Sequence, residues 1–225
     1  MDEPPTRKRY WARSLVGWQR FGRARPNDAH RALAALESQG RLGLLVTQNV
    51  DRLHQAAGSA KVVDLHGRLD LVRCMGCERR TAREALQEAL LSLNPDWAGL
   101  DARVAPDGDA DLEGLDFARF EVPGCAACGG LLKPDVVFYG ESVPRERVTA
   151  AMQAVREADA MLVVGTSLMV YSGYRFAREA AAVGIPIASV NLGRTRADDL
   201  ISLKVAQSCS AALAFLLRDH TPCVI

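Results

Sequence analysis

Short hydrophobic segments that end in glycine or polar residues recur along the chain. They are rich in Val, Ile and Leu and have the length of buried strands, for which nearly continuous hydrophobicity is typical. The carboxyl ends of parallel strands meet at one edge of an open α/β sheet, so the residues that follow these segments are expected to share one crevice. The segments are Leu42–Thr47, Val62–Gly67, Met161–Val164 and Ile185–Val190.

Segments with helical spacing alternate with these strands. Pro26-Asn27-Asp28 has the form of a helix start, and apolar residues follow at helical intervals until Gly40. We therefore expect an α/β fold in which helices cover both faces of a parallel sheet. Further helices are predicted over Thr6–Phe21, Val50–Ala57, Thr81–Leu93, Gly173–Ala182 and Ser210–Leu217.

Composition narrows the function. The chain has 225 residues, which is ample for one packed domain with a small second lobe. Its net charge of +1 argues against a dedicated nucleic-acid binder, and no apolar run approaches the roughly 20 residues that span a bilayer. Thr6–Phe21 combines basic and aromatic residues, as nuclear signals and nucleic-acid patches do, but a helix with inward aromatics and solvated arginines is favoured. The acidic, proline-containing start has neither a secretory nor an organelle-import pattern.

Four of the six cysteines form two matched pairs. Cys74-Met-Gly-Cys77 and Cys125-Ala-Ala-Cys128 each place two residues between thiols, so that both sulfurs can reach one tetrahedral ion. Two disulfides or a redox pair are the alternatives, but a single redox motif does not require two matched knuckles. We expect one zinc ion with four protein ligands, which is a structural site because no coordination position stays open. Cys209 and Cys223 lie outside the knuckles.

His66 follows a predicted strand, at the edge where ligand crevices form. An imidazole with an ordinary pKa of about 6.5 can accept a proton near neutrality, so His66 is a candidate general base. For His30 a solvent-facing position is predicted, and for His54 a packing or capping role. Asp107, Asp109 and Asp111 alternate as in a calcium loop, but Leu112 stands where that loop requires glycine and Ala118 where it requires glutamate, so calcium is rejected there.

Several segments, taken in order, resemble one family. The chain is similar to sirtuins, NAD-dependent protein deacylases, over residues of about 7–217. The segments are Thr47–His54, Leu65-His66-Gly67, the two cysteine knuckles, Lys133–Glu141, Gly165-Thr166-Ser167 and Asn191-Leu192-Gly193. Arg9–Arg13, Val16–Trp18, Leu93–Pro95, Ala105–Asp109 and Val170–Phe176 further resemble the mitochondrial class II branch, the sirtuin four type.

The resemblance implies roles for individual residues. His66 would accept the proton of the nicotinamide-ribose hydroxyl once the acyl-lysine oxygen has displaced nicotinamide. An acyl-lysine peptide would bind as an added strand between Ser167–Tyr171 and a segment containing Val137, Phe138, Tyr139, Gly140 and Glu141. The residues expected to hold NAD are Gln48, Asn49, Val50 and Asp51 at the ribose and nicotinamide, and Gly165, Thr166, Ser167, Asn191, Leu192, Gly193 and Cys209 on the adenosine side.

The chain departs from the sirtuin pattern at its start. Nothing before Trp11 matches the first strand or the Gly-Ala-Gly-x-Ser loop that cradles the pyrophosphate. The expected fold is therefore a Rossmann-like parallel sheet without its first strand, and impaired NAD turnover is expected. The expected division is a discontinuous NAD-binding domain of residues 1–68 and 131–225 with an inserted zinc lobe of residues 69–130. Val170-Tyr171-Ser172 also departs, because many sirtuins have proline here.

The resemblance predicts an enzyme that converts acyl-lysine and NAD to lysine, nicotinamide and O-acyl-ADP-ribose. Mono-ADP-ribosyl transfer at the same site and a non-catalytic zinc-bearing binding module are the alternatives. Acyl-lysine proteins are the expected partners, with no nucleic acid and no membrane, and the oligomeric state is left open. By family resemblance the mitochondrial matrix is the expected location; since the start carries no import signal, the cytoplasm is the alternative.

Overall fold

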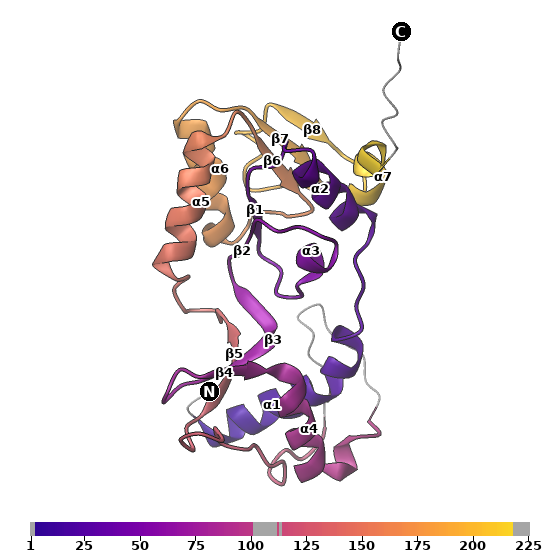
Figure 1. The fold of residues 1–225 in the computed structure, drawn as a ribbon, viewed down its shortest axis with the longest axis vertical. Helices are drawn as coiled ribbons and strands as arrows, with labels where there is room; N and C mark the ends of the chain where they lie inside the picture. The colour runs from indigo at the N-terminus through magenta and orange to yellow at the C-terminus, as the bar shows by residue number, and fades with distance from the viewer. Residues whose placement is uncertain (1–2, 101–111, 113, 218–225) are drawn as a thin grey trace. The chain divides into compact units, whose positions relative to one another are not determined.

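The structure, a computed structural model, describes residues 3–100, 112 and 114–217 (Figure 1). The chain divides into two compact units. Unit 1 comprises Met1–Ala24 and Gly67–Val137, and unit 2 comprises Arg25–His66 and Phe138–Ile225. The aspartates of the rejected calcium loop, the segment Ala105–Asp109 and Cys223 lie outside the described residues. No helix of the described part is long and apolar enough to cross a membrane.

Unit 1 is built on a three-stranded antiparallel sheet. Its strands β3 (Gly67–Cys74), β4 (Arg80–Ala82) and β5 (Leu132–Val136) lie in the order β4-β3-β5. The helices are α1 (Pro4–Phe21), α4 (Arg83–Leu93) and the short 3₁₀ helix η1 (Pro95–Trp97). The sequence predicted both longer helices. The segment Leu69–Arg73 also predicts a strand, which corresponds to β3. The strands β4 and β5, which are short or contain proline, were not predicted.

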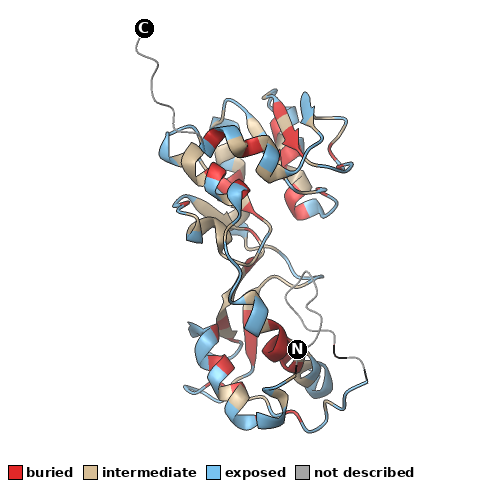
Figure 2. Cartoon of the chain, turned by 90° about the vertical axis from the view of Figure 1, so that its right-hand side faces the viewer, coloured by how far each residue is buried: buried red, intermediate tan, exposed pale blue. Residues whose placement is uncertain are grey.

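Helix α1 belongs to unit 1, whereas the sequence-based division assigned its residues to the nucleotide-binding part. The physical reason is its apolar face. Figure 2 shows the buried positions of the chain in red. Trp11 and Leu15 are fully buried in the core of unit 1, and the Trp11 indole donates a hydrogen bond of 3.3 Å to the Leu132 carbonyl. The expected inward aromatic and outward arginine are therefore confirmed for this helix at the buried Trp11 and at the exposed Arg9, whereas Arg7 is half-buried.

Unit 2 contains parallel strands and their covering helices. Strand β1 (Leu45–Thr47) pairs with β2 (Val62–Asp64), and β6 (Met161–Val164), β7 (Ile187–Val190) and β8 (Leu203–Val205) form a second parallel group in that order. In Figure 1 α5 and α6 lie on one side of these strands and α2 and α7 on the other. The helical bounds are α2 (Asp28–Ser38), α3 (Leu53–Ala56), α5 (Arg145–Glu157), α6 (Tyr171–Ala182), α7 (Cys209–Leu213) and the 3₁₀ helix η2 (Ala214–Leu217).

Apolar side chains hold these layers together. Ala29, Ala32 and Leu33 of α2 pack with Leu45 and Val190 on one side of the strands. On the other side, Ala177 and Ala180 of α6 pack against Val163 and Ile187. This arrangement confirms the predicted Rossmann-like α/β fold with a parallel sheet. The predicted sixth helix, Ser210–Leu217, is instead a single α-helical turn of α7 continued by η2.

Candidate active site and metal centre

The imidazole of His66 is held from both sides. Its Nδ1 lies 3.1 Å from the Gln48 backbone carbonyl, and its Nε2 lies 2.8 Å from the Ser172 hydroxyl. A carbonyl can only accept, so Nδ1–H is the donor, and in the neutral ring Nε2 accepts a hydrogen bond from Ser172. Nε2 thus carries the lone pair that can take up a proton.

The surroundings of His66 keep it neutral. Burial lowers the pKa of His66 below its ordinary value, the Gln48 carbonyl opposes this shift, and the positive charge of Arg147 adds to it. Arg147 also donates a hydrogen bond of 3.5 Å to the Leu65 carbonyl. A general base must be unprotonated at working pH, and this environment meets that need at neutrality.

The loop after β1 is fixed by polar contacts. The Gln48 side chain donates to the Thr166 hydroxyl over 2.9 Å, and the Asn49 amide donates to the Thr47 hydroxyl over 3.1 Å. Asp51 accepts from the Leu53 backbone amide over 2.9 Å in an Asx turn just before α3, so one of its carboxylate oxygens has a structural role. Val50 is half-buried beside them.

The predicted adenosine-side residues gather at the carboxyl ends of β6, β7 and β8. The Gly165 amide donates to the Val190 carbonyl over 2.9 Å, and the Asn191 amide donates to the Val205 carbonyl over 3.1 Å. Gly165 has φ of +61°, and a Cβ there would lie 3.1 Å from the Cys209 sulfur, so glycine allows the two segments to approach.

The hydrogen bond from Gln48 to Thr166 connects the predicted nicotinamide-ribose side of the nucleotide site to the predicted adenosine side, both within unit 2. Backbone amides, hydroxyls and carboxamides dominate the set, and such groups suit a ribose and a base at the edge of an open parallel sheet. The residues present therefore fit a dinucleotide. Leu192 is exposed, and Asn191 donates its side-chain amide to the Gly193 carbonyl over 3.0 Å, which shapes that turn.

The predicted peptide segment forms a turn in unit 2. The Glu141 amide donates to the Phe138 carbonyl over 3.0 Å, and the Phe138 amide donates to the Glu141 carboxylate over 2.9 Å. Tyr139, at the tip of this turn, is 99% exposed, and the following Gly140 has φ of +87°. Val137 is half-buried at the end of unit 1. An exposed tip is what a peptide-binding rim requires.

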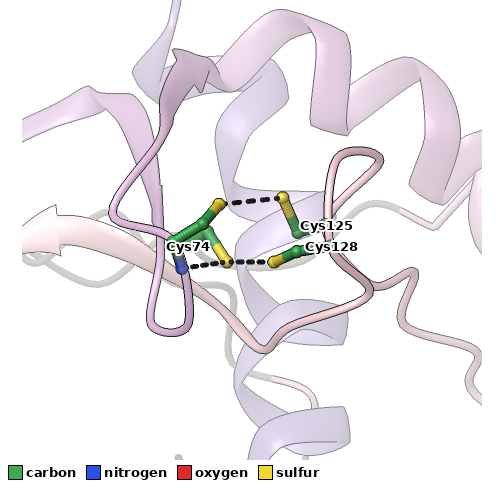
Figure 3. Close-up of side chains that lie close together, drawn as sticks. Cys74, Cys125 and Cys128 are labelled. Carbon is green, nitrogen blue, oxygen red and sulfur yellow. Dashed lines mark hydrogen bonds between the residues drawn. The ribbon is translucent and has the colours of Figure 1, made fainter.

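The two cysteine knuckles come together in unit 1. The four sulfurs lie within 4.8 Å of one another, with 3.5 Å between Cys74 and Cys128 and 3.8 Å between Cys77 and Cys125 (Figure 3). Zinc–sulfur bonds of about 2.3 Å in a tetrahedron place sulfurs about 3.8 Å apart, whereas a disulfide is about 2.05 Å long. The cluster therefore fits a zinc ion and not two disulfides.

Glycines make the knuckles compact. A Cβ on Gly130 would lie 2.9 Å from the Cys74 sulfur, so a side chain there would enter the space between the sulfurs. The Gly76 amide donates to the Cys74 sulfur over 3.3 Å, which favours the thiolate that a metal needs. With four protein ligands the site is structural.

Two histidines outside the site form a pair. The rings of His30 and His54 lie 4.7 Å apart in a tilted arrangement. His54 therefore has a packing role, as predicted. His30 is not solvent-facing as predicted: it is half-buried, and it completes a capping box with Asn27 at the start of α2.

Comparisons with known proteins agree with this site. The Sir2 family model matches residues 1–172. A relative from Bradyrhizobium diazoefficiens, named NAD-dependent protein deacetylase 2, is 66% identical over 217 residues, which cover 96% of this chain and 80% of the relative. The chain belongs to the Sir2 family.

Further relatives and solved structures support the same assignment. A Xanthomonas campestris protein named NAD-dependent protein deacetylase is 66% identical over 222 residues, covering 99% of this chain and 76% of that protein. The solved structure described as "Sir2-p53 peptide-NAD+" aligns with a TM-score of 0.72 and 32% identity, covering 88% of this chain and 71% of that one. Sirtuins use NAD, and the expected NAD cofactor and zinc site are both consistent with this family.

The expected mitochondrial location is wrong. The relatives described above come from bacteria, which have no mitochondria, and a Bordetella bronchiseptica relative is 64% identical over 214 residues. The expectation rested on segments shared with one branch of the family. Such segments indicate evolutionary relationship and do not determine the location of a protein in the cell.

Sequence reasoning missed two residues at His66. Ser172 and Arg147 lie 106 and 82 positions away from their partners His66 and Leu65. The one available signal for Ser172 was its departure from the proline of many sirtuins. No signal in the sequence pointed to Arg147.

Proposed function

We propose that this sirtuin is an NAD-dependent protein lysine deacylase in which His66 is the general base. The observation that carries the proposal is the fixed tautomer of His66, whose Nε2 lone pair stands at the same sheet edge as the nucleotide-binding loops. The high identity to bacterial proteins named NAD-dependent protein deacetylase supports acetyl-lysine as a substrate.

When bound, NAD would supply an ADP-ribose group that accepts the acyl group as nicotinamide leaves, and one water molecule would be consumed in releasing the lysine. His66 accepts at Nε2 the proton of the nicotinamide-ribose hydroxyl. Gln48, Asn49, Val50 and Asp51 orient the ribose and nicotinamide. The groups proposed to hold the adenosine side are Gly165, Thr166, Ser167, Asn191, Leu192, Gly193 and the backbone at Cys209.

The acyl-lysine peptide is proposed to add as a strand between Ser167–Tyr171 and Val137–Glu141. Backbone hydrogen bonds would bind the peptide and a pocket would select the acyl-lysine. One solved structure with a TM-score of 0.72 and 31% identity is described as "Sir2 bound to acetylated peptide", which supports an acetylated peptide as the ligand.

Two finer statements complete the proposal. The 225 residues contain no Gly-Ala-Gly-x-Ser segment, so this polypeptide alone is proposed to turn NAD over slowly; robust deacylation by it would refute that statement. The segment Val170–Phe176, with Arg9–Arg13, supports a place in the class II branch of sirtuins, which a phylogeny of full-length sequences tests.

The first experiment is a calorimetric titration of NAD into the zinc-loaded, folded chain, with folding verified by circular dichroism. Binding of NAD supports the proposal. Assays with acetyl-lysine peptides then distinguish deacylation from ADP-ribosyl transfer by the product that forms. O-acetyl-ADP-ribose supports deacylation, whereas ADP-ribosylated protein without it points to ADP-ribosyl transfer. A folded chain that binds no NAD would be a zinc-bearing binding module.

A further inference from the structure

The hydroxyl of Ser172 occupies the proton-accepting side of the His66 ring. Its Oγ lies 2.8 Å from Nε2, and Ser172 is 9% exposed, so water has little access to this contact. Ser172 stands in the first turn of α6, whose N-cap is Val170. The start of a rigid helix fixes the hydroxyl in place.

Gly173, the residue after Ser172, leaves space for Gln48, the second hydrogen-bond partner of His66. A Cβ on Gly173 would lie 2.7 Å from the Gln48 side-chain oxygen, so glycine at this position lets Gln48 pack against α6. Gln48 in turn receives Nδ1–H of His66 on its backbone carbonyl. Two successive residues of α6 thus set both hydrogen bonds of the ring.

We propose that Ser172 is a positioning residue that holds the imidazole of His66 in one orientation until the ribose hydroxyl replaces the serine as the hydrogen-bond donor to Nε2. This inference rests on the proposed function. A serine hydroxyl can donate to neutral Nε2 before the ribose hydroxyl arrives and can accept from protonated Nε2–H after the proton has been transferred, so it holds the ring before and after that step. Many sirtuins have proline in the segment that corresponds to Val170-Tyr171-Ser172, and proline offers no hydroxyl.

Removing the Ser172 hydroxyl is expected to change the pKa of His66 in a predictable direction. The bond accepted from protonated Nε2–H is charge-assisted and stronger than the bond donated to the neutral ring. Ser172→Ala therefore destabilises the protonated ring more than the neutral ring. We expect a lower pKa for His66 in Ser172→Ala and a nearly unchanged one in Ser172→Thr, which keeps the hydroxyl.

The test combines NMR titration of the histidine rings with steady-state kinetics. The chain has four histidines, so His66 is assigned with one His66→Gln variant. In Ser172→Ala we expect the pKa of His66 to fall and kcat to drop roughly 10-fold, with KM for NAD and peptide within about twofold. Ser172→Thr should restore both, and Ser38→Ala, which removes a hydroxyl bonded to Ala35 on α2, should change neither.

Each outcome is decisive. An unchanged ring titration in Ser172→Ala overturns the proposal, even if kcat falls, because the residue would then be merely structural. The NMR arm needs no turnover, so it decides the role of Ser172 even if the chain proves not to deacylate. Absence of acyl transfer in the parent chain contradicts the proposed function instead.

A second and independent observation concerns a surface formed by Tyr171, Tyr174, Arg175, Arg178 and Arg196, called here the arginine–tyrosine patch. The Arg175 guanidinium lies 5.2 Å from the Tyr171 ring centre, and the Arg196 guanidinium lies 4.5 Å from that of Tyr174. Arg178 donates to the Tyr171 hydroxyl over 3.4 Å. Stacking holds the guanidinium groups in place. Arg178 and Arg196 are exposed, so their remaining N–H donors stay available, whereas Nε of Arg175 is buried.

The positive charge of the patch is not neutralised. No carboxylate among the described residues forms an ion pair with any of the three arginines. Asp198, two positions after Arg196, pairs instead with Lys204 over 2.7 Å. Arg196 also donates to the Met169 carbonyl over 3.0 Å, so the patch adjoins the exposed Met169 and Val170 of the proposed peptide-binding segment.

We infer that the arginine–tyrosine patch binds acidic side chains that flank the acyl-lysine of a substrate protein. Planar guanidinium forks match carboxylates bidentately, and charge complementarity next to a peptide-binding segment sets specificity. This inference also rests on the proposed function, because it uses the proposed place of the peptide.

The test measures binding of two fluorescent acetyl-lysine peptides by anisotropy, one with flanking glutamates and one with flanking lysines. We expect the parent chain to bind the glutamate peptide roughly 10-fold more tightly, with a smaller difference at high salt. Arg178→Glu should cut that preference several-fold. Arg41→Glu, an equal charge change at an exposed arginine after α2, should not.

Equal binding of the two peptides by the parent chain overturns this inference and leaves the deacylase proposal standing. A preference that Arg178→Glu and Arg41→Glu reduce equally also overturns it, because the effect would then come from net charge. Failure of the proposed function shows separately, as an absence of acyl transfer from either peptide.

Discussion

The side-chain amide of Gln48 donates a hydrogen bond of 2.9 Å to the hydroxyl of Thr166, across 118 positions of sequence. The contact joins the loop after β1 to the loop after β6. The backbone carbonyl of the same Gln48 accepts from His66 Nδ1. One residue therefore couples the proposed base to the proposed nucleotide loops.

Replacing Thr166 with valine removes the acceptor of Gln48 at nearly constant shape. A neutral hydrogen bond contributes about 1 kcal/mol, so we expect NAD to bind about 5-fold more weakly while the melting temperature changes little. Calorimetric titration of NAD measures this. Thr149→Val, on the exposed face of α5, is the control, and equal NAD affinity in the two variants would contradict the coupling.

Gly67→Ala is expected to destabilise unit 1 severely. Gly67 has φ of +87°, and a Cβ there would lie 2.1 Å from the Asp135 carbonyl oxygen. Strain and overlap together should cost more than about 2 kcal/mol of unfolding free energy. Urea unfolding followed by circular dichroism measures the loss. Gly43→Ala, whose Cβ meets nothing within 4 Å, should cost little or stabilise slightly, and similar losses in both variants would refute the local explanation.

Zinc removal is expected to unfold the knuckles of unit 1. Small zinc domains gain about 10–16 kcal/mol of apparent binding free energy from their metal. We expect one zinc per chain by metal analysis, and faster amide exchange around Cys74 and Cys125 after chelation. Cys125→Ser should lose the metal, and Cys209→Ser should keep it. Full zinc content in Cys125→Ser would disprove the four-cysteine site.

The His30–His54 pair predicts acid sensitivity. The pKa of His54 is lowered to about 4, mainly by burial and next by the neighbouring His30, while Asp51 and Asp64 oppose the shift. The Nδ1 atom of His54 is buried without a partner. The unfolded chain binds its proton near pH 6.5, so the stability due to neutral His54 is complete above that pH and declines as pH falls towards 4.

A fully buried group would lose about 3 kcal/mol over that range, and since His54 is partly exposed we expect roughly half of that. Thermal melts of the parent chain and of His54→Gln between pH 7 and 4.5 measure the slope. The variant should show the flatter profile. Equal slopes would show that His54 does not carry the acid sensitivity.

The strands β1, β2, β6 and β7, the helices α1, α2, α4 and α6, and the zinc knuckles could be predicted because each depends on local pattern. Helix α5 and strand β8 were not predicted. β-Branched residues indicate the strand at Val62–Asp64, and the capping residue Asn27 indicates the start of α2. The two-residue spacing of Cys74 and Cys77 indicates a metal knuckle. The identity of His66 as a candidate base followed from its place after a strand.

Contacts between distant residues could not be predicted in this way. Nothing near Ser172 in the sequence indicates that α6 places its hydroxyl against His66. The membership of α1 in unit 1 depends on the burial of Trp11 beside Leu132, 121 positions away. β5 was missed because Lys133-Pro134-Asp135 is polar and contains proline, although Lys133 and Pro134 are buried by tertiary packing.

The most direct test of the account is the formation of O-acetyl-ADP-ribose from NAD and an acetyl-lysine peptide by the zinc-loaded chain, measured by mass spectrometry beside His66→Ala. We expect slow but measurable formation that falls at least 100-fold in His66→Ala, since general base catalysis contributes about 10²–10⁴-fold. Equal rates in the two proteins, or no product from a folded parent chain that has bound NAD, would contradict the central claim.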